Sequence, residues 1–239
     1  MKEIKDKVSV AMATYNGEKY IKEQISTILD NLRECDELII SDDGSTDNTI
    51  NIIKEFKDER IKFLEGPKKG LKKNFENAIN NTTGDYIFLT DQDDIWMHDK
   101  VKEMLDVFKS SNYILIQHDA IVVDENDRVI FESFAEHRKV KTGIIKNLIK
   151  NSYHGCCIAF KKELKDKILP IPNNIYLHDQ WIGMIAELEG KTYFLDKKLI
   201  KYRRHSDNTS SFKHLSIPKM IKNRVQYFFR LLEYIQRRK

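Results

Sequence analysis

The sequence predicts an α/β protein with a mainly parallel, doubly wound sheet that is flanked by helices. In the first half of the chain, short apolar runs alternate with longer stretches whose apolar residues recur at helical spacing. Strands that alternate with helices in this way pair in parallel, and the helices cover the sheet. Clusters of acidic and polar residues follow the apolar runs, at the edge where such sheets bind their ligands.

The first half is predicted to hold four strands and three helices in alternation. The strands are residues 8–12, 37–41, 61–64 and 85–89, and the helices are residues 20–32, 46–56 and 71–81. One face of the first helix is apolar and carries Ile21, Ile25, Ile28 and Leu32. Ser45 is expected to cap the second helix, because a serine oxygen accepts the free N–H groups of a first helical turn.

The second half is less regular and ends in an amphipathic helix. We expect a strand at 156–160, a helix at 179–189, and short strands at 191–195 and 199–202. The final helix, residues 218–239, has an apolar face that consists of Ile221, Val225, Phe228, Leu232 and Ile235, opposite Lys219, Asn223, Gln226, Arg230 and Arg237. The simplest division is one continuous domain, residues 1–212, and a helical tail, residues 213–239.

The composition is that of an ordinary globular protein. Of the 239 residues, 41% are hydrophobic and 33% are charged. No apolar run approaches the ~20 residues that span a bilayer, and the N-terminus has no apolar signal core. The three cysteines lack metal-ligand spacing, so we interpret them as reduced thiols, which fits a cytoplasmic protein.

Positive charge is concentrated in the tail. Residues 213–239 contain eight lysines and arginines and one glutamate, a net charge of +7, so the rest of a chain with net charge +4 carries −3. Such a helix can pack on the main domain or on a second copy of the chain, and it can also lie on the inner face of an anionic membrane. No nucleic-acid partner is expected, because the basic residues do not belong to a motif that recognises nucleic acids.

Crowded carboxylates follow the fourth predicted strand. Asp91, Gln92, Asp93 and Asp94 come directly after a buried apolar run. Carboxylates held together at the end of a buried strand repel each other, and a divalent cation relieves that repulsion. Their hard oxygen ligands suit Mg²⁺ or Mn²⁺, which also bridge phosphate oxygens. The alternative reading of such a cluster is a solvated acidic turn.

The second predicted strand also ends in acids, Asp42 and Asp43, followed by Gly44. A carboxylate at this edge can accept an N–H from a nucleobase, although a turn followed by a helix cap explains the same residues. The chain has neither a GxGxxG after its first strand nor a GxxxxGK[ST]. Dinucleotide-binding and P-loop functions are therefore excluded.

Two further motifs carry candidate chemistry. Asp179 opens a predicted helix, where the helix dipole favours a carboxylate and lowers its pKa; a general base at this position needs burial to offset that effect. Arg203, Arg204 and His205 follow the last predicted strand. The arginines could meet phosphates, and His205 could join an aspartate-bound cation.

Taken together, these motifs resemble glycosyltransferase family 2, whose nucleotide-sugar-binding fold is called GT-A. The matching segments occur in the family's order over roughly residues 8–208, namely residues 8–17, 41–47, 89–96, 154–157, 178–181 and 202–208. The sequences DQDD-W, HD-W and YR-H--N are most similar to the rhamnosyltransferase-like bacterial subgroup, which builds O-antigen, capsule and other surface polysaccharides.

The resemblance implies a role for each matched residue. Asp179 would be the catalytic base, and the metal ligands would be Asp93, Asp91 and His205. The donor nucleotide and its sugar would contact Ala13, Thr14, Tyr15, Asn16, Asp42, Asp43, Lys73, Asp91, Gln92, Gly155 and Arg203. Many members have proline where this chain has His98, and residues 70–74, which include Lys73, match only loosely.

The implied activity is inverting, metal-dependent sugar transfer that uses Mn²⁺ or Mg²⁺. The donor would be a UDP- or dTDP-sugar carrying rhamnose, galactose or glucose, and the acceptor a lipid-linked glycan at the cytoplasmic membrane face. Residues 218–239 would contact the membrane or form a homodimer. Two other functions stay open. A nucleotidyltransferase normally carries a Gly-rich basic loop after its first strand, which this chain lacks; a non-catalytic carbohydrate-binding module would not need Asp91, Asp93 and Asp179.

Overall fold

A computed structural model of the chain describes residues 6–206, 208 and 216–238. Within them the strands are β1 Val8–Thr14, β2 Glu37–Asp42, β3 Ile61–Glu65, β4 Tyr86–Thr90, β5 Ile95–Trp96, β6 Tyr113–Asp124, β7 Val129–Phe131, β8 Ile158–Lys161 and β9 Lys191–Arg204. The helices are α1 Ile21–Leu29, α2 Thr49–Glu55, α3 Leu71–Asn80, α4 Lys100–Lys109, α5 Phe134–Arg138, α6 Ile144–Ile149, α7 Lys165–Ile168, α8 His178–Glu189 and α9 Ile217–Arg237. The predicted boundary between residues 212 and 213 lies outside the described residues.

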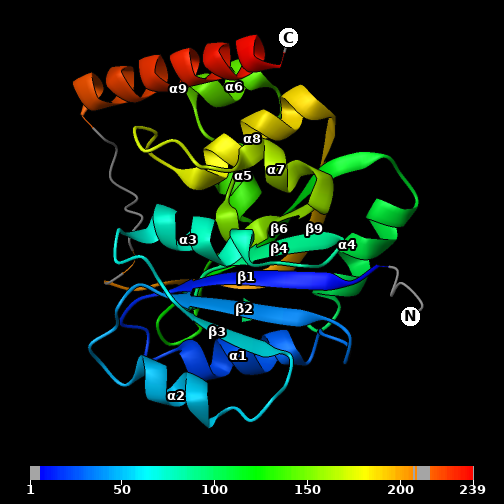
Figure 1. The fold of residues 1–239 in the computed structure, drawn as a ribbon, viewed down its shortest axis with the longest axis vertical. Helices are drawn as coiled ribbons and strands as arrows, with labels where there is room; N and C mark the ends of the chain where they lie inside the picture. The colour runs from blue at the N-terminus through cyan, green and yellow to red at the C-terminus, as the bar shows by residue number, and fades with distance from the viewer. Residues whose placement is uncertain (1–5, 207, 209–215, 239) are drawn as a thin grey trace.

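The strands form one sheet in the order β3-β2-β1-β4-β8-β6-β9-β5, with β7 paired to β6 (Figure 1). The first-half strands β3, β2, β1 and β4 pair in parallel, as predicted. β8 lies antiparallel between β4 and β6, and β9 is parallel to β6. The predicted α/β class is confirmed; the sheet is mixed, with the first-half strands in parallel and one further parallel pair, β6 with β9.

Both faces of the sheet are covered. Along β1, Val8, Val10 and Met12 belong to one apolar cluster, whereas Ala11 and Ala13 belong to another. Successive side chains of a strand point to opposite faces, so a strand that is apolar throughout needs a helical layer on each side. In Figure 1, α1 and α2 cover one face, and α3, α8 and α9 lie on the other.

Several predicted elements differ in detail from the structure. α2 begins at Thr49, and Ser45 does not cap it, because its hydroxyl donates to Asp42 Oδ2 at 2.6 Å. The first turn of α2 is held instead by the carboxylate of Asp47, which accepts the N–H of Thr49 at 3.0 Å. The two short strands predicted in 191–202 are one strand, β9, with irregular register near its middle. The helix α4 and the long strand β6 were not predicted.

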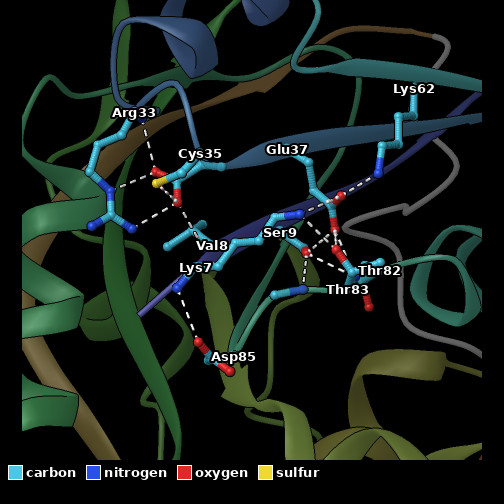
Figure 2. Close-up of polar contacts among 12 residues, drawn as sticks. Lys7, Val8, Ser9, Arg33, Cys35, Glu37, Lys62, Thr82, Thr83 and Asp85 are labelled. Carbon is cyan, nitrogen blue, oxygen red and sulfur yellow. Dashed lines mark hydrogen bonds and ion pairs between the residues drawn. The ribbon is translucent and has the colours of Figure 1, made fainter. Parts of the chain in front are cut away.

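The amino-terminal edge of the parallel strands holds a closed polar network (Figure 2). The carboxylate of Glu37, at the start of β2, accepts hydrogen bonds from Lys62 Nζ at 2.7 Å and Lys7 Nζ at 3.1 Å. It also accepts from the Ser9 hydroxyl and from the N–H of Thr83. Burial alone would raise the pKa of Glu37, but these donors lower it to about 2. This network joins β1, β2 and β3 at the end opposite the predicted site.

Candidate active site

Most of the site residues predicted from the sequence lie at the carboxyl ends of β1, β2 and β4 or on the loops that follow; Lys73, Gly155, Asp179, Arg203 and His205 come from other elements. Asp42 ends β2, and its two oxygens accept the N–H groups of Gly44 and Ser45 and the hydroxyls of Ser45 and Thr14. Three of these contacts lie within the turn after β2, and the fourth joins Asp42 to the end of β1, so Asp42 shapes the turn into the loop. Gly44 takes a φ of 94° there, a conformation that glycine adopts without strain.

The loop after β1 is fastened to the acid loop after β4. The side-chain amide of Gln92 accepts the N–H of Tyr15 at 2.9 Å and donates to the Tyr15 carbonyl at 3.0 Å. A Cβ on Gly17 would lie 2.4 Å from Gln92 Oε1, so glycine is required for this packing. The ring of Tyr15 is left 55% exposed. The Gln92 amide therefore binds the Tyr15 backbone, and the Tyr15 side chain stays open to solvent.

Asn16 and Asp43 tie the same region to neighbouring loops. Asn16 Oδ1 accepts the N–H of Thr46 at 2.8 Å. The carboxylate of Asp43 accepts the N–H groups of Lys69 and Gly70, at 3.2 and 2.7 Å. Each oxygen of Asp43 retains acceptor capacity beyond these bonds. Ala13, Thr14, Tyr15, Asn16, Asp42 and Asp43 thus form a continuous rim at the ends of β1 and β2.

Asp91 and Asp94 form a charged cluster around a buried lysine. One carboxylate oxygen of each aspartate and the Sγ of Cys156 lie within 4.8 Å of one another. Lys100 is fully buried; its ammonium donates to the Cys156 carbonyl at 2.8 Å and stands 3.9 Å above the Trp96 ring. Burial lowers the pKa of Lys100 to about 8. This one buried cation faces two acids.

The pKa values of both aspartates are raised. Desolvation, followed by the charge of Asp93, raises the pKa of Asp94 to about 7. For Asp91, desolvation and then the charges of Asp94 and Asp93 raise the pKa well above its usual value. Asp94 Oδ1 accepts the N–H of Arg203 at 3.2 Å; Oδ2 is buried and makes no hydrogen bond of normal geometry to a described residue, although the weak Cys156 thiol donor interacts with this carboxyl.

Asp93 meets residues from the far end of β9. Its Oδ2 lies 2.8 Å from His205 Nε2 and 3.0 Å from Asn208 Nδ2. The ring of His205 also lies against Tyr20, with centroids 4.8 Å apart. A segment that is distant in sequence thus closes over the acid loop. Asn208 belongs to the matched C-terminal motif, although no separate role was predicted for it.

Asp179 occupies the first turn of α8. Its Oδ1 accepts the N–H of Gln180 at 2.6 Å and the Asn151 amide at 3.4 Å. Burial raises the pKa of Asp179 to about 6, and the hydrogen bonds from Gln180, Gly155 and Asn151 oppose that rise. The burial that a base at a helix N-terminus requires is therefore present. A carboxylate of this kind is ionised at neutral pH and is basic enough to take a proton.

The structure brings Asp179 and the acid cluster together. The charge of Asp179 contributes to the raised pKa of Asp91, so the two carboxylates lie within electrostatic range of each other. Gly155 and Cys156 lie between them: Cys156 touches the Asp91–Asp94 pair, and a Cβ on Gly155 would lie 3.8 Å from the Cβ of Asp179. Beside Asp179, burial lowers the pKa of His178 to about 3, so its ring is neutral.

Two of the predicted donor contacts have other partners. Lys73 Nζ binds both oxygens of Glu76 and the carbonyl of Ile171. The guanidinium of Arg203 pairs with Glu23 at 2.7 Å and Asp127 at 3.3 Å and stacks over Tyr20. Neither cation is directed at the acid cluster, so a phosphate contact by either stays a prediction.

Sequence reasoning missed Lys100, Asn151 and Asn208. Lys100 belongs to a helix that was not predicted, and a lysine that is fully buried has no signal in a single sequence. Asn151 and Asn208 act through contacts with residues far along the chain. The one usable signal was the position of Asn208 inside the matched C-terminal motif.

The residues present fit a divalent cation. Three carboxylates crowd around one buried lysine, and the buried Asp94 Oδ2 makes no hydrogen bond of normal geometry to a described residue. Among the described residues, the predicted ligands Asp91, Asp93 and His205 do not meet as one group: Asp91 meets Asp94 and the Sγ of Cys156, whereas His205 lies on Asp93. Oxygen-rich sets of this kind suit Mg²⁺ or Mn²⁺.

Comparison with solved structures defines the class of fold. The S. aureus TarS 1–349 chain, solved with UDP-GlcNAc, superposes with a TM-score of 0.73 at 20% identity over 91% of this chain and 64% of that one. The Pyrobaculum calidifontis mannosyltransferase PcManGT, solved with GDP-Man and Mn²⁺, gives 0.65 at 19% identity over 85% of this chain and 59% of that one. The protein therefore has the GT-A fold of nucleotide-sugar-dependent glycosyltransferases, as predicted.

Comparison of sequences identifies the family. Residues 9–169 match the glycosyl transferase family 2. The Shigella flexneri dTDP-rhamnosyl transferase RfbG is 32% identical over 82% of this chain and 72% of its own length. The Escherichia coli glucosyltransferase WfgD is 27% identical over 95% and 92%. The chain belongs to glycosyltransferase family 2, which confirms the family prediction. It spans 66% of another relative, the uncharacterized glycosyltransferase alr2836 of Nostoc.

Proposed function

We propose that this protein transfers a sugar from a UDP- or dTDP-sugar to a hydroxyl of a glycan acceptor, with inversion at the anomeric carbon. The observation that carries the proposal is the meeting of Asp179 and Asp91 across Gly155 and Cys156. A base on one side of a sugar and a phosphate-binding cluster on the other is the arrangement that a direct displacement requires. The same two acids are distant in sequence, so only the fold joins them.

The donor nucleotide would lie along the rim at the ends of β1 and β2. The exposed Tyr15 ring offers a stacking surface for the base, and the free acceptor capacity of Asp43 suits a base N–H. Asp91, Asp93 and His205 would hold a divalent cation, which supplies charge neutralisation for the departing diphosphate when bound. The sugar would then extend toward Gly155, which packs closely on α8: a Cβ there would lie 3.2 Å from His178 Nε2 and 3.8 Å from the Cβ of Asp179.

Asp179 would act as the general base. Its carboxylate removes the proton of the acceptor hydroxyl as the oxygen attacks the anomeric carbon, and the bond from that carbon to the nucleotide phosphate breaks on the opposite face. A well-placed base contributes roughly 10²–10⁴-fold to the rate. Asn151 and the N–H groups of Gln180 and Gly155 hold the carboxylate in one orientation.

The names of the relatives support the sugars and the setting proposed here. RfbG is a dTDP-rhamnosyl transferase, and WfgD uses UDP-Glc with a diphosphoundecaprenol-linked GlcNAc acceptor. We therefore place this protein in surface polysaccharide biosynthesis, with a lipid-linked acceptor and rhamnose, glucose or galactose as the donor sugar. Contact of residues 218–239 with the cytoplasmic membrane face, or with a second copy, is part of the same proposal. Among the described residues, no helix is long and apolar enough to cross a bilayer.

The decisive experiment measures turnover with UDP-Glc, UDP-Gal and dTDP-rhamnose in the presence of Mn²⁺. For the donor that is used, Asp179→Asn should lower the turnover number by roughly 10²–10⁴-fold, because the base is lost, and donor binding should persist. Asp166→Asn, an exposed carboxylate on α7, is the matched control and should leave turnover unchanged. A near wild-type rate for Asp179→Asn would remove this residue from the mechanism.

A further inference from the structure

The C-terminal helix α9 docks through a face that the sequence did not single out. The Tyr227 hydroxyl donates to the Leu177 carbonyl at 2.7 Å and accepts the Leu177 N–H at 2.8 Å. Leu231 is buried beside it, and Tyr234 meets the Trp181 ring edge-on. The predicted apolar face, which consists of Ile221, Val225, Phe228, Leu232 and Ile235, is exposed instead, with Ile221 at 52% and Phe228 at 47%. The helix thus has two apolar faces, of which one is covered.

A second exposed apolar surface adjoins it. On α6, Ile145 is 76% exposed and Ile149 is 60% exposed. The guanidinium of Arg224 donates twice to the Ile149 carbonyl, at 2.8 and 3.1 Å. Arg224 lies one residue from Val225 and within one helical turn of Ile221 and Phe228. The end of α6 therefore lies against α9 at the border between its docked face and its exposed face, and the two helices share one end of the molecule (Figure 1).

The charge around these helices has one sign. Residues 137–150 contain five lysines and arginines and no acid, and residues 217–238 contain six and one glutamate, Glu233. The two segments together carry +10, so the remainder of a chain with net charge +4 carries −6. Lys141, Lys146 and Lys150 are exposed next to the isoleucines of α6, and Lys219 and Lys222 are exposed on α9. Exposed isoleucines and a phenylalanine thus lie on two segments that are rich in cations.

We propose that residues 138–150, which include α6, and the outward face of α9 form one composite surface. This surface binds an anionic lipid leaflet. The apolar side chains enter the acyl boundary, and the surrounding lysines meet the headgroups, at about 1 kcal/mol for each cation near the surface. A second copy fits this surface poorly, because a two-fold contact would bring two basic surfaces against each other. Charge complementarity therefore selects the membrane as the occupant.

The composite surface is linked to the candidate catalytic residue. On the α6 side, Gln180 Nε2, next to Asp179, donates to the Asn147 carbonyl at 2.7 Å. On the α9 side, Tyr227 binds Leu177, the residue before α8 begins. A leaflet bound here would hold α8 at a fixed position relative to the bilayer. This last step rests on the proposed lipid-linked acceptor, whereas lipid binding itself does not.

The test is co-sedimentation of the whole chain with vesicles of phosphatidylcholine, with and without phosphatidylglycerol. Binding should require phosphatidylglycerol and weaken with salt. The double variant Ile145→Ser/Ile149→Ser should lower the partition coefficient about tenfold or more, since it removes apolar burial worth over 1 kcal/mol. The matched control is Val129→Ser/Ile130→Ser on β7, which alters two residues of similar exposure, 52% and 44%, and should bind normally.

Charge and association are tested separately. Lys141→Gln/Lys146→Gln should weaken binding to phosphatidylglycerol vesicles, whereas Lys57→Gln/Lys102→Gln, which removes two exposed lysines elsewhere, should not. Normal binding by the Ile145→Ser/Ile149→Ser variant, or equal binding to neutral vesicles, would overturn the proposal. A dimer in solution that this variant converts to a monomer would also overturn it. Lipid binding without any transferase turnover would contradict the proposed function and leave this inference standing.

Discussion

Buried acids lie at both ends of the parallel strands, and their pKa values are shifted in opposite directions. At the amino end, Glu37 is surrounded by Lys62, Lys7 and hydroxyl and backbone donors, and its pKa falls to about 2. At the carboxyl end, Asp91 and Asp94 face each other with Lys100 as their buried cation, and the pKa of Asp94 rises to about 7.

The difference separates an acid that stabilises the fold, Glu37, from acids that we propose to bind a ligand, Asp91 and Asp94. A carboxylate whose pKa is lowered contributes to stability, because its ionised form is favoured in the folded state. A carboxylate whose pKa is raised costs stability, and a protein retains such a group where a bound charge relieves the cost. The contrast predicts that substitutions at the two ends will affect different measurements.

The largest effect is expected on turnover at the carboxyl end. Asp93→Asn should lower turnover by roughly 10²–10³-fold, because a metal-held diphosphate is worth several kcal/mol. The melting temperature without ligand should stay the same or rise, because a repelling charge is removed. EDTA should abolish wild-type activity and Mn²⁺ or Mg²⁺ should restore it. The control is Asp99→Asn, an exposed acid nearby; metal-independent turnover would end the metal role assigned to Asp93.

The second effect is expected on stability at the amino end. Glu37→Gln should lower the free energy of unfolding by about 2–3 kcal/mol, because two partly exposed lysines and the Thr83 N–H lose a charged acceptor. Turnover at a temperature where the variant is folded should be unchanged. Urea denaturation measures the loss, with the exposed Glu34→Gln as the control. A variant that lost turnover but not stability would contradict the contrast between the two ends.

The smallest effect is the dependence on pH: activity and the stabilisation by Glu37 should both be lost as the pH falls, but in different pH ranges. Turnover should fall about tenfold per pH unit below about 6, as Asp179 is protonated. The stabilisation by Glu37 is fully present above its unfolded pKa of about 4.5 and is lost as the pH falls toward about 2. Between pH 6 and 5 the enzyme should therefore lose activity while its Glu37 network stays intact. Coincident loss of both would contradict these assignments.

The parallel half of the fold was predictable, because each of its strands is a short, mainly apolar run and helical patterns separate these runs. The strand β6 was not, although it pairs with β8, β9 and β7. Its middle reads Gln117-His118-Asp119, which looks like a polar break, yet all three residues are buried. Their partners lie elsewhere: Asp119 accepts from Ser133 and from the N–H of Ala135, and Gln117 binds the backbone of residues 152 and 154.

The sequence placed Asp91 and Asp179 in one candidate site, and the structure brings these two acids near each other, while their roles stay predictions. The sequence did not predict which partners the individual side chains have. The sequence suggested that Asp42 could accept a hydrogen bond from a nucleobase. In the structure its oxygens accept hydrogen bonds from residues 44 and 45 instead. Lys73 appeared free to meet a phosphate, and it binds Glu76 and Ile171. Local patterns do not reveal how such donors and acceptors are shared.

The paired hydrogen bonds between Gln92 and the backbone of Tyr15 have a thermodynamic consequence. Gln92 stands between Asp91 and Asp93, so the loop that would stack against a nucleobase and the loop that would coordinate a cation move as one body. When a ligand orders one loop, the other loop loses conformational freedom as well, so a second ligand has less entropy to remove. Nucleotide and cation should consequently bind with positive cooperativity, each raising the affinity of the other by the same factor.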